Sequence, residues 1–149
     1  MSTLRVPCRR LPQSKDLPLP KRQSEGAAGL DLYAALTEAL VLAPGSRALV
    51  PTGLEIAIPP GYEGQVRARS GLAVKHGLGL VNAPGTIDSD YRGEIRVPMI
   101  NWGGESVTLK RGDRIAQLVI APVAQAELEE SDVLPETNRG GGGFGSTGS

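Results

Sequence analysis

The sequence GTIDSDYRGE, residues 85–94, lies just past the middle of the chain and combines strand-forming with turn-forming residues. Its β-branched threonine and isoleucine favour a strand, and DSD at residues 88–90 favours a bend that carries carboxylates. YRG at residues 91–93 predicts a turn into a further strand at residues 94–100. The stretch therefore predicts two strands that are joined by an acidic bend.

Asp88 lies at the edge of this predicted turn, where it would face any ligand that binds there. A carboxylate in that place can deprotonate a water molecule, and the ring of Tyr91 can pack against a sugar or a base. The alternative is a polar turn whose aspartates only hydrogen-bond to their own backbone. Taken alone, these ten residues favour that alternative.

The composition of the chain predicts an all-β fold. The chain has 149 residues, 40% hydrophobic and 21% charged, which suits a single domain with a hydrophobic core. Its 20 glycines and 12 prolines alternate with short runs of Val, Ile and Leu, which favours many short strands and turns. Aromatic residues are only 3% of the chain, so the core must be aliphatic. We predict an all-β domain at residues 1–128 and a C-terminal arm at residues 129–149.

Charge and cysteine content exclude several classes of partner. The 16 basic residues balance the 16 acidic ones without forming a stripe, so a nucleic-acid polymer is not expected as a partner. The single Cys8 excludes an intramolecular disulfide and cannot build a structural zinc site with the single His76. No apolar run approaches the roughly 20 residues of a membrane span, and the N-terminus lacks the apolar segment of a signal peptide. These features predict a cytoplasmic protein without membrane contact.

Residues 69–77, RSGLAVKHG, follow a predicted strand and favour one or two helical turns. Ser70 would lie near the helix N-terminus, where free backbone N–H groups attract an anion, and Arg69 adds a planar charged fork. Such a site suits a phosphate. The alternative has equal weight: Ser70 caps the helix and Arg69 pairs with a surface carboxylate.

Two patterns predict how neighbouring strands are joined. Residues 40–43, 47–50 and 54–58 predict a meander of strands. Residues 78–81 and 86–87 flank NAPG and predict a hairpin with a Pro-Gly turn. The alternating backbone donors and acceptors of that hairpin would suit a flat ligand.

Two single residues interrupt strands that are otherwise apolar. Asp31 lies within AAGLDLYA, residues 27–34, and a lone aspartate of this kind is usually part of a bulge or a turn. In the predicted strand at residues 114–121, alternation puts Gln117 on the face of Ile115 and opposite to Arg114, Ala116 and Leu118. The amide of Gln117 therefore needs a hydrogen-bonding partner.

The end of the chain cannot contribute to a core. Acidic and polar residues at 129–138 are followed by RGGGGFGSTG at 139–148. Repeated glycines with Ser and Thr can wrap an anion, Arg139 adds charge, and Phe144 offers a ring that can stack on a base. The alternative is a disordered low-complexity tail. The single phenylalanine favours a mobile lid that a ligand orders.

Five stretches, taken in order, resemble the five motifs of the trimeric dUTP pyrophosphatase (dUTPase) family. They are AAGLDLYA, RSGLA, GTIDSDYRGE, GDRIAQL and RGGGGFGSTG, and their order and spacing match from Gly26 onward. The sequence departs from the family pattern at Ala68, where proline is frequent, and at Arg96, where methionine or lysine is common. Neither departure removes a chemical group that the family's mechanism needs.

The resemblance implies a distorted jelly-roll subunit, a dUTPase-like β-clip, with a flexible glycine-rich C-terminal arm. It further implies a homotrimer with active sites shared between subunits, and Mg²⁺-dependent hydrolysis of dUTP to dUMP and pyrophosphate. This reaction keeps uracil out of DNA and supplies dUMP for dTMP synthesis.

The resemblance also assigns roles to residues. Asp88 is expected to be the general base that orients water for attack on the α-phosphorus, and it also holds the sugar 3′-OH. Tyr91 is expected under the deoxyribose, where it leaves no room for a 2′-OH. The three phosphates and waters would hold Mg²⁺, with Asp31 touching only its waters. The other expected substrate-binding residues are, for uracil, Asn82, Gly85, Thr86, Ile87, Arg96 and Phe144, and for the phosphates, Arg69, Ser70, Gly71, Gln117, Arg139, Ser146 and Thr147. Gly145 is also expected to bind the substrate.

Three rival interpretations of the sequence differ in function. A dCTP deaminase resembles this family in fold and phosphate binding, but it differs at the base and lacks this tail. A catalytically silent dUTPase-like regulator would bind nucleotide or protein without hydrolysis; the presence of Asp88, Tyr91 and the complete tail argues against it. A purely structural jelly roll explains the strands but neither the tail nor Gln117.

Overall fold

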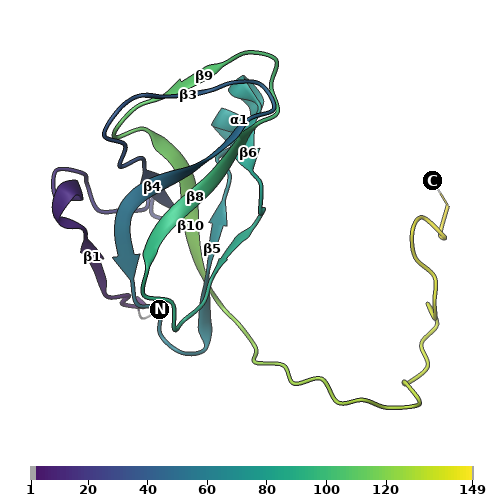
Figure 1. Cartoon of the computed structure of the whole chain (residues 1–149). Coiled ribbons are helices and arrows are strands. Elements are labelled where there is room, and N and C mark those ends of the chain that lie inside the picture. The colour runs from purple at the N-terminus through teal and green to yellow at the C-terminus, as the bar shows by residue number, and fades with distance from the viewer. Residues whose placement is uncertain (1–2, 149) are drawn as a thin grey trace.

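The structure is a computed structural model that describes residues 3–148, so the outer limits predicted for the domain and the arm, at residues 1 and 149, fall outside the described residues. Within 3–148 the chain forms ten strands, one 3₁₀ helix and one α-helix (Figure 1). The all-β prediction is therefore confirmed. No helix in this part of the chain is long and apolar enough to cross a membrane.

The strands form two antiparallel sheets and a two-stranded ribbon. The first sheet has the order β1-β4-β8-β6, with β1 (Cys8–Arg10), β4 (Arg47–Ile56), β8 (Glu94–Asn101) and β6 (Leu78–Leu80). The second has the order β2-β10-β5-β7, with β2 (Leu30–Tyr33), β10 (Arg114–Pro122), β5 (Tyr62–Arg67) and β7 (Gly85–Ile87). The ribbon pairs β3 (Leu40–Leu42) with β9 (Val107–Leu109). The 3₁₀ helix η1 (Pro12–Ser14) follows β1.

Strand β8 shows how the sequence builds the core. Its residues alternate, so that Ile95, Val97, Met99 and Asn101 are buried, whereas the residues between them are more exposed. The amide of Asn101 is satisfied because it donates to Leu42 O at 2.9 Å. The buried apolar side chains of residues 3–148 include no Phe, Tyr or Trp, as the composition predicted. Each fully buried Leu, Ile or Val stabilises the fold by about 1.5–3 kcal/mol.

The predicted meander is wrong in its pairing. Residues 47–50 and 54–56 belong to one strand, β4, whereas β3 pairs with β9. A bulge in the pairing of β4 with β8, between Pro51 and Glu55, absorbs the segment PTG that separates the two halves in the sequence. Gly53 adopts a φ of 64° there, a left-handed conformation that glycine tolerates. The bulge lets the strand continue through a proline and a glycine.

The predicted hairpin across residues 78–87 is also wrong. β6 pairs with β8 in the first sheet, and β7 pairs with β5 in the second. The chain therefore crosses from one sheet to the other through NAPG, where the Ala83–Pro84 peptide is cis. The acidic bend after β7 returns the chain to the first sheet, because it leads into β8. Both connections thus span the gap between the sheets.

The remaining elements are short. Helix α1 (Ser70–His76) ends at Gly77, whose φ of 70° turns the chain sharply and whose N–H donates to Ala73 O. The last strand ends at Pro122, and the chain then leaves the sheets as an extended, exposed arm (Figure 1). The domain boundary between residues 128 and 129 stays a prediction.

Candidate active site

A groove with a cavity volume of about 590 Å³ lies between β7, the acidic bend and β8. It gathers seven of the residues that the sequence predicted for a site. These are Asn82, Gly85, Thr86, Ile87, Asp88, Tyr91 and Arg96, and the groove is completed by Leu49, Val66, Gly93, Glu94, Ile95 and Pro98. The groove collects them because the two connections between the sheets meet there.

The acidic bend is fixed by hydrogen bonds within itself. Tyr91 N donates to Asp88 O at 3.2 Å, and Nη1 of Arg92 donates to the carbonyls of Ser89 at 2.7 Å and of Tyr91 at 2.9 Å. The Tyr91 hydroxyl donates to Glu94 O at 2.9 Å. The bend therefore presents Asp88 and the tyrosine ring in a defined arrangement.

The groove has two carboxylates, and only one of them is free. Glu94 accepts a hydrogen bond from Gly53 N at 2.9 Å through Oε1, and its Oε2 pairs with Nε of Arg96 at 3.2 Å. The side chain of Asp88 is exposed and has no hydrogen bond or ion pair with any residue of 3–148. Asp88 is thus the carboxylate that can act on a bound molecule.

A second group of predicted residues surrounds Asp31 on β2. Asp31 is 8% exposed, and each of its carboxylate oxygens meets a different guanidinium. Oδ1 lies 3.3 Å from Nε of Arg69, and Oδ2 lies 3.3 Å from Nη1 of Arg114. Arg69 also donates to the backbone carbonyl of Arg114 at 3.2 Å. We call this group, Asp31 with Arg69 and Arg114, the arginine–aspartate cluster.

Arg114 has no role in the predicted site, and the predicted alternation along its strand put it on the face opposite to Gln117, which is wrong. A bulge between Arg114 and Ala116 in the pairing with β2 shifts the alternation, so that Arg114 reaches the face of Asp31 and Gln117. One signal was available in the sequence: a buried aspartate requires a positive partner, and GDRIAQL supplies an arginine. Arg69 does pair with a carboxylate, but this carboxylate is the buried Asp31.

Gln117 and helix α1 adjoin the cluster. The Gln117 amide donates to Ala68 O at 2.9 Å, so the predicted need for a partner is confirmed. Gly29 makes room for this side chain, because a Cβ there would lie 2.3 Å from Gln117 Oε1. Ser70 and Gly71 are exposed at the start of α1, and no side chain caps the helix, so the capping alternative is wrong.

Asp88 and Arg69 lie toward opposite ends of β5, whereas the groove itself extends along β5 as far as Val66. β5 pairs with β7 through Gly64 and Ile87, and it reaches the cluster only at its other end, beyond Arg67. At about 3.3 Å per residue, the part of β5 from the level of Asp88 to Arg67 spans roughly 13 Å, and Arg69 lies two residues beyond the end of the strand. One chain therefore does not bring its own Asp88 to its own Arg69.

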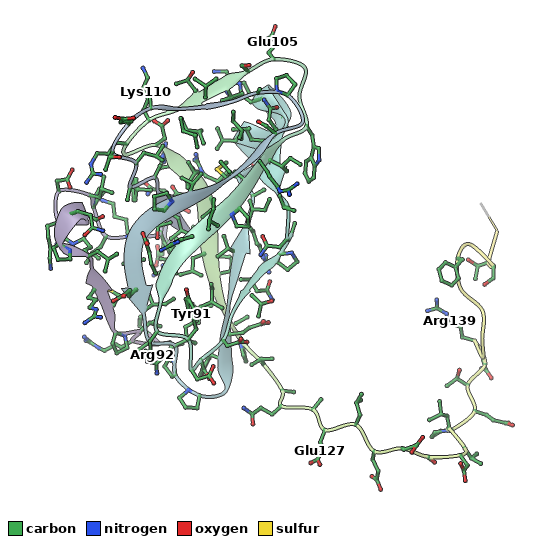
Figure 2. The ribbon with its side chains drawn as sticks, viewed as in Figure 1. Tyr91, Arg92, Glu105, Lys110, Glu127 and Arg139 are labelled. Carbon is green, nitrogen blue, oxygen red and sulfur yellow. The ribbon has the colours of Figure 1, made fainter. Side chains whose placement is uncertain are left out.

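The predicted residues of the arm form a third group, which is distant from both. Figure 2 shows Arg139 on the far part of the arm, well away from Tyr91 and Arg92 at the sheets. Its Nε donates to Gly142 O at 2.7 Å, and the hydrogen bonds of residues 124–148 are all made within the arm. Phe144, Gly145, Ser146 and Thr147 are exposed.

The family model described as dUTPase matches residues 15–148. The chain belongs to the dUTPase family. This match confirms the resemblance that the five stretches indicated.

Two curated relatives are dUTPases by name. The deoxyuridine 5′-triphosphate nucleotidohydrolase of Anaeromyxobacter sp. (strain Fw109-5) is 66% identical over 132 residues, which cover 89% of this chain and 88% of the relative. The nucleotidohydrolase of the same name from Methylocella silvestris is 60% identical over 147 residues, which cover 97% of this chain and 92% of the relative.

Solved dUTPases have the same fold. The Staphylococcus bacteriophage 80alpha dUTPase with dUpNHpp superimposes with a TM-score of 0.88 at 29% identity, over 99% of this chain and 100% of that one. A mutant dUTPase from phage phi11 of S. aureus, in which a structural Mg(II) ion is coordinated, matches with a TM-score of 0.78 at 26% identity, over 87% of this chain and 98% of that one. The predicted dUTPase-like fold is therefore confirmed.

In this dUTPase, residues 3–148 contain no group of three or more His, Cys, Asp or Glu side chains that could hold a metal ion. Asp31 is the predicted residue for contact with a metal. Its two oxygens accept one guanidinium each, and a carboxylate offers about four lone-pair positions. Asp31 therefore retains room to accept hydrogen bonds from metal-bound water, which suits Mg²⁺ because that ion dehydrates reluctantly.

Proposed function

We propose that the chain hydrolyses dUTP to dUMP and pyrophosphate with Asp88 as general base, at sites shared between the subunits of a homotrimer. The reaction is that of the dUTPase family, to which the chain belongs, and of the relatives named for it. We assign the catalytic site to the groove because the free carboxylate of Asp88 lies there.

Asp88 accepts a proton from a water molecule as the water oxygen attacks the α-phosphorus in line. The new bond joins the water oxygen to the α-phosphorus, and the bond from that phosphorus to the bridging oxygen breaks. Pyrophosphate leaves with the electron pair. Glu94 does not replace Asp88 in this step, because Gly53 N and Arg96 occupy its oxygens.

Strand β7 supplies the contacts for uracil. It is an edge strand, paired with β5 on one side only, so the backbone N–H and C=O groups of its other side remain available. Gly85, Thr86 and Ile87 line the groove with Asn82, where these groups can pair with the N–H and the two carbonyls of uracil. Cytosine exchanges a donor and an acceptor at this edge and would leave buried groups unpaired.

The ring of Tyr91 supports the deoxyribose. It lies over Gly93, where an added Cβ would be 2.6 Å from Cζ of the ring, and it lines the groove next to Asp88. A ring fixed in this position leaves no room for a 2′-OH, which selects a deoxynucleotide. The backbone of Arg96 completes the uracil end of the groove.

The α- and β-phosphates bind to Arg69, Ser70, Gly71 and Gln117 on another subunit. The arginine–aspartate cluster carries two positive charges and one negative charge, so a net positive charge remains for a polyphosphate. Bound to the phosphates, Mg²⁺ would neutralise charge on their oxygens, with Asp31 in contact through water. The coordination of Mg(II) in the phage phi11 dUTPase supports this ion for the family.

The separation of the groups supports sites shared between subunits, and the resemblance to the trimeric dUTPases supports three subunits. Because roughly 13 Å of β5 and two further residues separate the level of Asp88 from Arg69 in one chain, a complete site requires the groove of one subunit and the cluster of another. A ring of identical subunits supplies both at every interface. The arm, residues 129–149, then closes on a neighbouring site, with Phe144 over the uracil and Arg139, Gly145, Ser146 and Thr147 at the γ-phosphate.

Product analysis tests this function against its rivals. The chain is incubated with dUTP or dCTP, with Mg²⁺ or with EDTA, and the nucleotides are separated by ion-pair chromatography. We expect dUMP and pyrophosphate from dUTP only when Mg²⁺ is present, and no change in dCTP. Conversion of dCTP to a uracil nucleotide would instead indicate a deaminase, and binding of dUTP without turnover would indicate a silent regulator.

A further inference from the structure

Arg114 is the first residue of β10, and it contacts both other members of the arginine–aspartate cluster. Its Nη1 donates to Asp31 Oδ2 at 3.3 Å, and its backbone carbonyl accepts a hydrogen bond from Nη1 of Arg69 at 3.2 Å. Asp31 comes from β2 and Arg69 from the start of α1, so Arg114 joins three segments that are distant in the sequence. Its side chain is 45% exposed, and that of Asp31 is 12% exposed.

The local fold fixes Arg114 in this place. The turn before β10 is closed by the carboxylate of Asp113, which accepts a hydrogen bond from Lys110 N at 2.7 Å, and by Gly112, with a φ of 84°. Ala34 N donates to Asp113 O at 2.8 Å, which ties the turn to the end of β2.

The bulge then sets the direction of the side chain. Gln117 pairs directly with Asp31, and in a regular strand Arg114, three residues earlier, would point to the opposite face. The register shift between Arg114 and Ala116 corrects this, and both Ile115 and Ala116 are buried as a result. The irregularity therefore brings a second arginine to a carboxylate that already has one.

We propose that Arg114 is a positioning residue, which holds the Asp31 carboxylate so that Arg69 can leave it for the triphosphate. Arg69 meets Asp31 through Nε and the Arg114 carbonyl through Nη1, so a phosphate that draws the guanidinium toward itself takes Nε away from Asp31. A nearly buried carboxylate that lost its only cationic partner would be strongly disfavoured, and Arg114 prevents this loss. This inference rests on the proposed function, because it assigns the phosphates to Arg69.

The competing interpretation is purely structural: the pair of Arg114 and Asp31 only links β10 to β2. If this is the only role of the pair, a variant without Arg114 should be less stable than the wild-type chain but should bind nucleotide with the same affinity. The positioning role predicts that, without Arg114, Asp31 retains Arg69 with both oxygens, so that the phosphates have to compete for it. Nucleotide affinity, measured apart from stability, separates the two interpretations.

The test compares Arg114→Ala and Arg114→Lys with Arg111→Ala. Arg111 is a matched control, because it also pairs with an aspartate, Asp16, at 2.6 Å, and no role in the site is assigned to it. Calorimetric titration measures the affinity for dUpNHpp with and without Mg²⁺, steady-state kinetics measure KM and kcat for dUTP, and thermal melting measures stability.

We expect Arg114→Ala to weaken dUpNHpp binding by about 10-fold or more, as is typical for the loss of a group that orients a ligand-binding side chain. KM for dUTP should rise by a similar factor with kcat little changed, because Arg69 contributes binding energy to substrate and transition state alike. Arg114→Lys should restore most of the affinity, since it returns a positive donor to Asp31. Arg111→Ala should bind dUpNHpp as the wild-type chain does, whatever its melting temperature.

A double-mutant cycle tests the route through Asp31. In an Asp31→Asn chain, Arg114→Ala should add little further loss, because the carboxylate that would retain Arg69 is gone. Additive losses would overturn the inference, and so would an Arg114→Ala chain with wild-type affinity and a lowered melting temperature. If Arg114→Ala does not fold, Arg114→Met takes its place in the same cycle, because it keeps the aliphatic stem of the side chain and removes the charged donor. Failure of the proposed function would show in the wild-type chain, as absent dUTP turnover, whereas failure of this inference would show only in the Arg114 variants.

Discussion

Replacing Gly93 with alanine should disable the groove while leaving the fold nearly intact. An added Cβ would lie 2.4 Å from the Tyr91 hydroxyl oxygen, 2.6 Å from Cζ and 3.1 Å from Cε2. Because carbon atoms in ordinary contact are about 3.5–4.0 Å apart, the tyrosine ring has to move by about 1 Å. The methyl group and the displaced ring both change the part of the groove that receives the sugar.

The effect on stability should be small and the effect on activity large. Loss of the 2.9 Å hydrogen bond from Tyr91 to Glu94 O costs about 1 kcal/mol net. Tyr91 as a residue is 43% exposed, so little apolar burial is lost when its ring moves. A displacement of about 1 Å in a group that positions the substrate can lower the rate by about 10²-fold. We therefore expect kcat/KM for dUTP to fall by about 10-fold to 100-fold, with a change of a few degrees in Tm.

Steady-state kinetics and thermal melting of the same preparations measure both effects. Gly104→Ala is the matched control, because a Cβ there has no neighbour within 4 Å, and it should leave kcat/KM unchanged. Tyr91→Phe removes the hydroxyl but keeps the ring, so it should lose much less activity than Gly93→Ala. Wild-type kcat/KM in Gly93→Ala would refute the position that we assign to the ring.

Three further predictions address the base, the arm and a surface ion pair. Asp88→Asn should retain affinity for dUpNHpp but lower kcat by at least about 10²-fold, as the loss of a general base does, and turnover within a few-fold of wild type would exclude Asp88 from that role. Deletion after Asn138 should leave the fold and the assembly intact. It should sharply reduce kcat/KM for dUTP but reduce the affinity for dUMP much less. Equal, rapid hydrogen exchange of the arm with and without dUpNHpp would contradict its role as a lid. Arg111 hydrogen-bonds to the Asp16 carboxylate and lowers the pKa of Asp16 below the usual 3.8. The pair therefore stabilises the fold at pH values above 3.8, and this stabilisation is lost as the pH falls through the folded-state pKa of Asp16. Asp16→Asn should therefore lower Tm more at neutral pH than at a pH well below 3.8, and an equal loss at both pH values would show that the charge is not responsible.

The groove could be predicted from the sequence because its residues are neighbours in the chain. Asn82 to Arg96 span the two connections between the sheets, and the turn-forming residues there mark the connections directly. The strands could be located for a similar reason, since alternation in a segment such as β8 is a local property.

Strand partners could not be predicted, because pairing depends on contacts between distant segments. PTG at residues 51–53 is typical of a turn, and only the partner strand β8 shows that it is a bulge within β4. The segments around NAPG are typical of a hairpin, yet β6 and β7 find different partners in different sheets. The same limit applies to Arg114, whose face depends on a register shift against β2. The separation of Asp88 from Arg69 required the sheet order, which no single segment contains.

Mixing two impaired variants tests most directly whether the site is shared between subunits. Asp88→Asn and Arg69→Ala chains are mixed in equal amounts in denaturant, refolded together and assayed at a dUTP concentration well below KM, where the weaker binding of Arg69→Ala also lowers the rate. In a closed ring whose sites combine Asp88 of one subunit with Arg69 of the next, each site has an even chance of each intact residue, so about one quarter of the wild-type activity should return. A mixture with no more activity than the separate variants would contradict the account, because it would mean that each chain brings its own Asp88 to its own Arg69.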